Sequence, residues 1–155
     1  KNGELNLKYK SLSHEVNKKL QSGQQLSPKE VSNIVSKIRM KVLPDLNKEP
    51  NAGSFFKNPI VKSSDINSSS FNLDDLILWN IDENYSKVGA ARLIELIKNS
   101  LNKYDNVSIS SKHNLVLTTN GNASQQEVLK LASEIQSKVK TTFNIDLEIE
   151  PRIIL

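Results

Sequence analysis

The segment from residue 27 to residue 44 combines apolar positions at helical spacing with signals for both ends of a helix. Ser27 and Glu30 form a capping box, and Pro28 occupies the first helical position. Pro44 follows the last apolar position and ends the pattern. The segment therefore predicts an amphipathic helix, whose apolar face comprises Val31, Ile34, Val35, Ile38 and Val42.

Two later segments show the same periodicity. One helix is predicted to begin near Lys87, and its apolar face comprises Ala90, Leu93, Ile94, Ile97 and Leu101. The other begins at a second capping box, Ser124 with Glu127, and Asn144 marks its C-terminal end. Its apolar face comprises Val128, Leu131, Ala132, Ile135 and Val139.

Short segments outside these helices have the apolar or alternating character of strands with a buried face. Residues 74–79 fit either a helix or a strand. The mixture predicts an α+β fold in which three amphipathic helices pack on a small mixed or antiparallel sheet. The predicted strands are residues 5–9, 54–61, 107–109, 115–118 and 145–149.

The length of 155 residues suits one ordinary domain. We expect residues 1–26 to form a short strand and a connecting segment, and residues 27–155 to form the α+β domain. The chain starts at Lys1 with no signal-peptide core, which is typical of a cut through a longer polypeptide. The absence of Cys excludes a disulfide framework and thiolate catalysis and is consistent with a cytoplasmic protein. No apolar run is long enough to cross a membrane.

The net charge of +4 is compatible with a nucleic acid, an anionic surface or a phosphate-bearing ligand. One hypothesis is therefore a basic α+β binding module for RNA or another anionic ligand, without catalytic activity. However, no strand interleaves aromatic and basic residues as base-stacking platforms do, so we do not expect a nucleic acid partner. The two histidines, His14 and His113, have no Cys companions, and no metal site is expected.

Residues 52–59 carry the side chains best suited to chemistry. Gly53 allows a backbone to approach a ligand closely, and Ser54 follows it where an apolar strand begins. A serine in a dry, hydrogen-bonded site can deliver a proton to a carbanion. Lys57 supplies a cation, and Asn58 offers both a donor and an acceptor. From residue chemistry alone, a tight turn into a core strand is the better explanation.

The segment is also part of a wider resemblance. As a contiguous block, Ala52-Gly53-Ser54-Phe55-Phe56-Lys57-Asn58-Pro59 is similar to the serine-bearing motif of UDP-N-acetylenolpyruvoylglucosamine reductases. This resemblance implies the C-terminal, substrate-binding part of an enzyme that makes UDP-N-acetylmuramate for bacterial peptidoglycan. Weaker matches stand in the family's order at residues 9–12, 31–39, 43–45, 87–95, 113–117 and 147–152.

The resemblance implies an FAD- and NADPH-dependent oxidoreductase. NADPH reduces FAD, and the reduced flavin passes a hydride to C3 of the enolpyruvyl group of UDP-N-acetylglucosamine enolpyruvate. C2 is then protonated. Ser54 inherits the role of the proton donor, and Glu150 inherits that of the glutamate that assists at the enolate. Apart from the resemblance, a solvated edge carboxylate is the alternative for Glu150.

The resemblance also implies four substrate-binding residues. Tyr9 and Asn58 occupy positions of substrate contacts, and His113 falls near a polar one. Trp79 falls where one form of the family has a loop tyrosine that clamps the UDP moiety, and a core position is its alternative. The family's lysine before Leu-Pro-Asp is shifted here to Lys41, one residue early, which turns a helical side chain by about 100°.

In the family, the FAD-binding half precedes the position of Tyr9 and carries glycine-rich phosphate loops. This chain has five glycines, and none is arranged as such a loop. We therefore expect no FAD site in this chain and no catalysis by the chain alone. The expected partner is the missing FAD-binding half, in cis or in trans.

Overall fold

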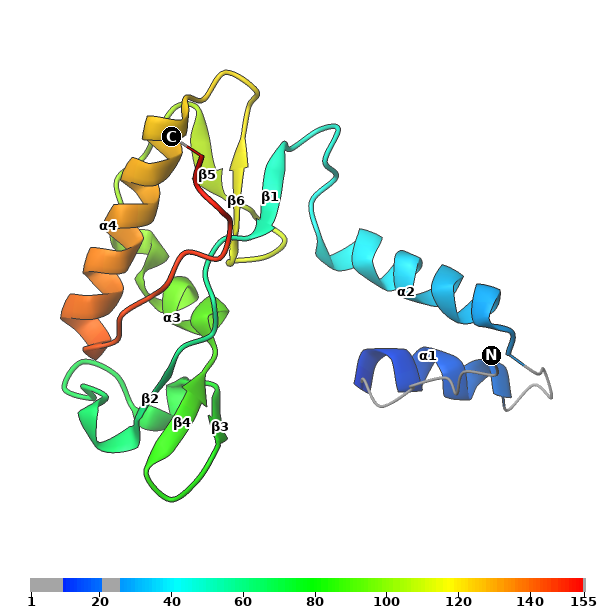
Figure 1. Cartoon of the computed structure of the whole chain (residues 1–155), viewed down its shortest axis with the longest axis horizontal. Coiled ribbons are helices and arrows are strands. Elements are labelled where there is room, and N and C mark those ends of the chain that lie inside the picture. The colour runs from blue at the N-terminus through cyan, green and yellow to red at the C-terminus, as the bar shows by residue number, and fades with distance from the viewer. Residues whose placement is uncertain (1–9, 21–25, 155) are drawn as a thin grey trace. The chain divides into compact units, whose positions relative to one another are not determined.

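The computed structural model describes residues 10–20 and 26–154 (Figure 1). The chain divides after Pro44 into two compact units. The strand predicted at residues 5–9 lies outside the described residues. The described residues form four α-helices and two small antiparallel sheets, which confirms the α+β class. None of the described helices has the length and apolar character that a membrane span requires.

The first unit contains a pair of helices, α1 (Lys10–Leu20) and α2 (Pro28–Val42). α2 confirms the predicted helix, and its capping box is formed as expected: the Glu30 carboxylate accepts from the Ser27 backbone N–H at 2.9 Å. α1 lies in a stretch for which the sequence predicted only a connecting segment. The apolar face of α2 packs on α1 around three buried residues, Leu12, Val16 and Ile34.

The second unit contains two three-stranded sheets in which every paired strand is antiparallel. One sheet has the order β1 (Asn51–Ser54), β6 (Val116–Thr119), β5 (Val107–Ile109). The other has the order β2 (Ile60–Lys62), β4 (Tyr85–Val88), β3 (Leu78–Asn80). The sequence predicted a single small sheet, whereas the strands form two. Residues 74–79, which fitted either element, comprise the end of a 3-10 turn (Leu73–Asp75) followed by the start of β3.

Helices α3 (Ala90–Ile97) and α4 (Gln125–Phe143) supply half of the buried residues in the core of the second unit. α4 starts at the predicted capping box and ends at Asn144, whose φ of 58° places it in the left-handed region. α3 begins three residues later than predicted, because Lys87 and Val88 belong to β4. Large side chains buried in this core include Phe56, Leu93, Ile94, Ile135, Val139 and Phe143.

The extended segment after α4 alternates in exposure as the sequence predicted for a half-buried strand. Ile145 and Leu147 are buried, whereas Asp146, Glu148 and Glu150 are exposed. Its ladder pairing is limited to a single bridge between Phe56 and Ile149. The C-terminal segment therefore lies beside residues 55–57, in the middle of the motif singled out from the sequence.

Candidate functional site

The motif at residues 52–59 links the two sheets of the second unit. It begins in β1 and leads into β2. Across β1 and β6, Asn51 lies opposite Thr118 and Ser54 opposite Val116, so β1 carries one extra residue, a β-bulge. Gly53 lies in this bulge with a φ of 79°, and its N–H donates to the Asn51 side chain at 2.9 Å. The bulge places Ser54 at the exposed end of β1.

Two buried phenylalanines fix the backbone after Ser54. Phe55 and Phe56 are 7% and 1% exposed, and their rings meet edge to face with centroids 5.4 Å apart. The Phe55 N–H donates to the carbonyl of Leu115 at 2.7 Å. The backbone that follows Ser54 is therefore held by core packing and by a hydrogen bond to the connection between β5 and β6.

The C-terminal segment forms hydrogen bonds with this backbone. The Glu150 N–H donates to the Phe55 carbonyl at 2.9 Å, and the Lys57 N–H donates to the Glu148 carbonyl at 3.0 Å. The Lys57 ammonium group also forms an ion pair with the Glu148 carboxylate. These contacts bring the segments of Ser54 and Glu150 together, although the two residues are far apart in the sequence.

Asn58 lies at the N-terminus of α3. Its side-chain Oδ1 accepts a hydrogen bond from the Ala90 N–H at 2.9 Å. One residue later, the Pro59 carbonyl accepts from the Val88 N–H at 2.8 Å. Asn58 is half-buried, and its side chain connects the motif to the start of a helix.

Trp79 lies on β3 and is 49% exposed, which excludes the alternative of a core position. It faces Lys87 of β4, which in turn faces Ile60 of β2. Directly opposed residues of neighbouring antiparallel strands project from the same face. An indole, an ammonium group and an aliphatic side chain therefore share one exposed face of this sheet.

His113 lies in the turn before β6. Its Nδ1 accepts a hydrogen bond from the Leu115 N–H at 3.2 Å, and its carbonyl accepts from the Val116 N–H at 2.9 Å. The carbonyl of the same Leu115 is the acceptor for Phe55. His113 thus shapes the turn that pairs with the motif, and Nε2 is the ring nitrogen not used in this turn.

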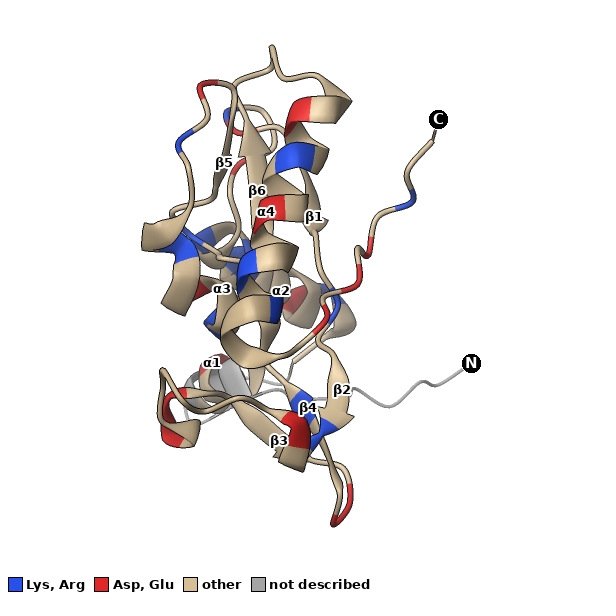
Figure 2. Cartoon of the chain, turned by 90° about the vertical axis from the view of Figure 1, so that its left-hand side faces the viewer, with Lys and Arg blue, Asp and Glu red and all other residues tan. Residues whose placement is uncertain are grey.

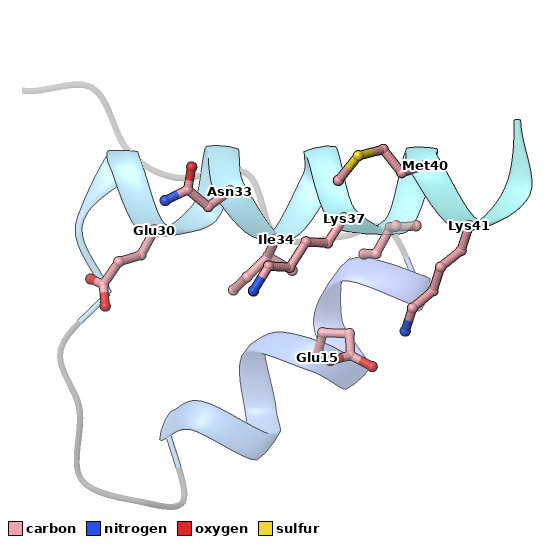
Figure 3. Close-up of a pocket in the computed structure, with 8 residues that line it drawn as sticks. Glu15, Glu30, Asn33, Ile34, Lys37, Met40 and Lys41 are labelled. Carbon is pink, nitrogen blue, oxygen red and sulfur yellow. The ribbon is translucent and has the colours of Figure 1, made fainter. Parts of the chain in front are cut away.

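Tyr9 and Lys41, both noted in the sequence, precede the second unit along the chain. Tyr9 lies outside the described residues. Lys41 lies on α2 and lines a pocket of about 480 Å³ between α2 and α1 (Figure 3). Lys37 and Lys41 extend from α2 towards α1, on which Glu15 lies.

Two of the acidic residues of the C-terminal segment form ion pairs with lysines of other elements. Figure 2 shows acidic positions along this segment, close to basic positions of neighbouring elements. Asp146 pairs with Lys140 at 2.9 Å, and Glu148 pairs with Lys57.

Within residues 10–20 and 26–154, no three His, Asp or Glu side chains converge as a metal site.

Sequence reasoning missed two contacts of this region. The contact from Asn58 to Ala90 spans 32 positions, and that from Lys57 to Glu148 spans 91. The alternating acidic residues near the C-terminus were a signal for an exposed strand face, but not for its partner. Backbone hydrogen bonds thus connect the segments of Ser54, Asn58, His113 and Glu150 around the motif. The segment before β3 is joined to the start of α3 by a bond from the Gly89 N–H to the Ile77 carbonyl.

Comparison with known proteins gives one consistent family. The C-terminal domain of UDP-N-acetylenolpyruvoylglucosamine reductase matches residues 43–154. The reductase of Flavobacterium johnsoniae is 36% identical over 126 residues, which is 81% of this chain and 37% of the relative. That of Buchnera aphidicola subsp. Acyrthosiphon pisum is 39% identical over 124 residues, 80% of this chain and 35% of the relative. The chain spans little more than a third of the length of these relatives.

Proposed function

Because this chain belongs to the UDP-N-acetylenolpyruvoylglucosamine reductase family and matches its C-terminal domain, we propose that it is the substrate-binding part of that reductase. In this proposal, Ser54 donates the proton to C2 of the enolpyruvyl group. The observation that supports it best is the pairing of the two segments that carry Ser54 and Glu150, through the bond from the Glu150 N–H to the Phe55 carbonyl.

Proton donation by Ser54 requires a site that excludes water. A serine hydroxyl is a weak acid, and a positioned donor is effective only where the developing charge is stabilised. Ser54 is exposed in this chain, so another part of the enzyme must cover it during the reaction. We assign this cover to the FAD-binding half and to the bound substrate.

Glu150 is the proposed partner of Ser54. It is exposed on the segment that pairs with the motif, and the neighbouring Glu148 is already engaged by Lys57. A carboxyl group beside the enolate can donate a hydrogen bond to it when protonated. Glu150 therefore stabilises the enolate that Ser54 protonates.

FAD and NADPH are the proposed cofactors, and the flavin, once reduced by NADPH, would supply the hydride for C3. The sequence has no glycine-rich phosphate loop, so these residues do not form the FAD site. We propose that the FAD-binding half holds the cofactor and that the isolated chain has no turnover. The chain's own contribution is then to bind the UDP-sugar and to move the proton.

The remaining proposed substrate contacts have different chemistries. Trp79 exposes an aromatic ring on β3, and Lys87 lies directly opposite it on β4; an aromatic ring and a cation suit a uracil ring and a diphosphate. His113 has Nε2 left for a ligand after Nδ1 is used by Leu115. Asn58 contributes an amide at the end of the motif, and Tyr9 completes the proposed set.

Rapid-reaction kinetics of the enzyme with its flavin half restored test the two catalytic assignments. Ser54→Ala and Glu150→Gln should leave flavin reduction by NADPH unchanged. Each should slow flavin reoxidation by the enolpyruvyl substrate about 10²–10⁴-fold, the usual loss for a missing acid or base. Reduction is the internal control, because it needs neither residue.

Glu148→Gln is the matched control for Glu150. It changes an exposed carboxylate on the same segment and removes only the ion pair with Lys57. Its effect on reoxidation should be small. Equal and small effects of the two glutamine substitutions would remove Glu150 from the mechanism, and normal reoxidation in Ser54→Ala would remove Ser54.

A further inference from the structure

The C-terminal segment, residues 145–154, runs back along α4 from the end of the helix towards its start (Figure 1). On one side it pairs with the serine-bearing motif. There the Glu150 N–H donates to the Phe55 carbonyl, and the Glu148 carbonyl accepts from the Lys57 N–H. The place of Glu150 beside the motif therefore depends on how firmly this segment is held.

The carbonyl of Leu147 points to the other side of the segment. Successive residues of an extended chain direct their backbone N–H and carbonyl groups to opposite edges. Because Glu148 and Glu150 direct theirs to the motif, Leu147 directs its carbonyl away from it. Leu147 is 4% exposed, and a buried carbonyl needs a donor. This edge of the segment faces a helix, so the donor has to be a side chain.

Gln136 of α4 supplies that donor. Its Nε2 donates to the Leu147 carbonyl at 2.7 Å, at the short end of the normal range, and the bond is partly buried. One turn later on the helix, Lys140 pairs with Asp146, but the Asp146 side chain is 83% exposed, and an exposed ion pair contributes little. Gln136 is therefore the stronger of these two polar contacts between α4 and the segment.

We propose that Gln136 is a positioning residue for the reaction. It holds the Leu147 carbonyl and thereby keeps the following Glu150 at the point beside the motif where its carboxyl group meets the enolate. Gln136 acts through the backbone of residues 147–150 and not by contact with the substrate. The proposal rests on the proposed function, in which Glu150 stabilises the enolate.

Gln125 provides a matched control on the same helix. Its Nε2 donates to the Ile154 carbonyl at 3.1 Å, so it binds the same segment beyond Glu150. Ile154 is 79% exposed, and water can replace the lost donor there at little cost. Gln125→Met should therefore leave Glu150 in place.

Two substitutions of Gln136 test the role of its donor. Gln136→Met keeps an unbranched side chain of similar length and loses the donor, whereas Gln136→Lys keeps a donor. Hydrogen exchange of the Glu150 amide in this chain measures how firmly the segment is held. Flavin reduction by NADPH and reoxidation by the enolpyruvyl substrate, in the enzyme with its flavin half restored, measure the effect on the reaction.

Gln136→Met should exchange the Glu150 amide about tenfold faster. It should slow reoxidation about 10- to 100-fold, because a small misplacement of a catalytic group is costly. Flavin reduction and the dissociation constant of the substrate should stay nearly unchanged, since the enolate forms only during the reaction. Gln136→Lys should restore most of both losses, and Gln125→Met should behave as the unmodified chain.

The same substitution in a Glu150→Gln background separates positioning from a general structural role. If Gln136 acts through Glu150, then Gln136→Met should slow reoxidation no further once the carboxyl group is absent. An equal slowing in both backgrounds would overturn the proposal. Unchanged reoxidation, or unchanged exchange of the Glu150 amide, in Gln136→Met alone would do the same.

Gln136→Asn, which draws the amide back by one methylene, is a second variant with the same expected results if Gln136→Met fails to fold. If Glu150→Gln is reoxidised normally, the assignment of Glu150 in the proposed function falls, and the kinetic role of Gln136 falls with it. Exchange of the Glu150 amide still decides whether Gln136 holds the segment, so the two failures are distinguishable.

Discussion

Gly53 determines how the chain leaves β1, because its φ of 79° belongs to a region that residues with a Cβ adopt only at a cost. The resulting bulge leaves Ser54 exposed and lets Phe55 turn into the core. Residue chemistry alone favoured a tight turn into a core strand, whereas the structure has a β-bulge at the end of β1, followed by two buried phenylalanines outside any strand. The geometry and the proposed proton transfer are compatible, because this bulge leaves the serine exposed.

Gly53→Ala should lower the free energy of unfolding by about 1–2 kcal/mol, the cost of a left-handed backbone for a residue with a Cβ. The space around Gly53 is open, and no atom lies within 4 Å of the point that an alanine Cβ would occupy. The expected cost is therefore conformational and not steric. Urea unfolding of both chains measures the difference.

Gly121→Ala provides a matched control for this substitution. Gly121 has a φ of 88° and similarly open surroundings, but it lies in the connection between β6 and α4. Both variants should lose similar stability, and only Gly53→Ala should weaken UDP-sugar binding. A Gly53→Ala variant as stable as the unmodified chain would contradict the argument from backbone conformation.

At the scale of residues, sequence reasoning found the motif but not its contacts. Ser54 and Asn58 could be singled out because their segment resembles the serine-bearing motif of the family. The capping of α3 by Asn58 could not be predicted, since Gly89 offers no signal for a partner 32 positions earlier. Hydrogen bonds between distant segments depend on the packing of the whole unit.

At the scale of elements, the capping boxes were the most reliable signals. Ser27 with Glu30 and Ser124 with Glu127 mark the starts of α2 and α4 because each box satisfies local N–H groups with local side chains. α1 has no acidic residue in its first turn, and its helical form went unpredicted. The start of α3 was misplaced because Lys87 pairs with strands on both sides and Val88 pairs with Leu78 of β3, a tertiary effect.

The capping box of α4 should make stability depend on pH. Hydrogen bonds from the Ser124 backbone N–H, and then from the Asn106 amide, lower the pKa of the Glu127 carboxyl below its ordinary range. A carboxyl whose pKa is lowered by folding contributes stability above its unfolded pKa, and this contribution is lost as pH falls through the folded value.

Glu127→Gln should therefore be less stable than the unmodified chain at neutral pH. The difference should shrink towards zero near pH 2, where the carboxyl is protonated in both folded and unfolded chains. Urea midpoints at the two pH values measure it. Asn106→Ala, which removes one of the bonds to Glu127, should reproduce part of the effect. A difference that stays constant with pH would rule out the carboxylate as its origin.

At the scale of the whole molecule, the two units have cores of unequal size. The second unit has a continuous cluster that includes Phe56, Leu93 and Phe143, whereas the described part of the first has three buried apolar residues between two helices. A short pair of helices with so little buried area is marginally stable by itself. The sequence could not predict this division, because the apolar face of α2 looks alike whether it covers a helix or a sheet.

Residues 45–155 should therefore fold without residues 1–44. The truncated chain should unfold cooperatively, and its amide spectrum should match that of the same residues in the full chain. Residues 1–44 alone should show little stable helix by circular dichroism. An unfolded 45–155 fragment would show that the core of the second unit depends on the first.

The bond between Lys57 and Glu148 joins residues 91 positions apart, and the neighbouring bond from Glu150 to Phe55 spans a similar stretch. Contacts of such long range form late, because the intervening chain must be ordered first. During synthesis, the ribosome makes residues 148–150 after both sheets and the four described helices. A chain cut short by a premature stop before these residues would contain the serine motif without the segment that pairs with it, so the proposed site requires translation through this last stretch.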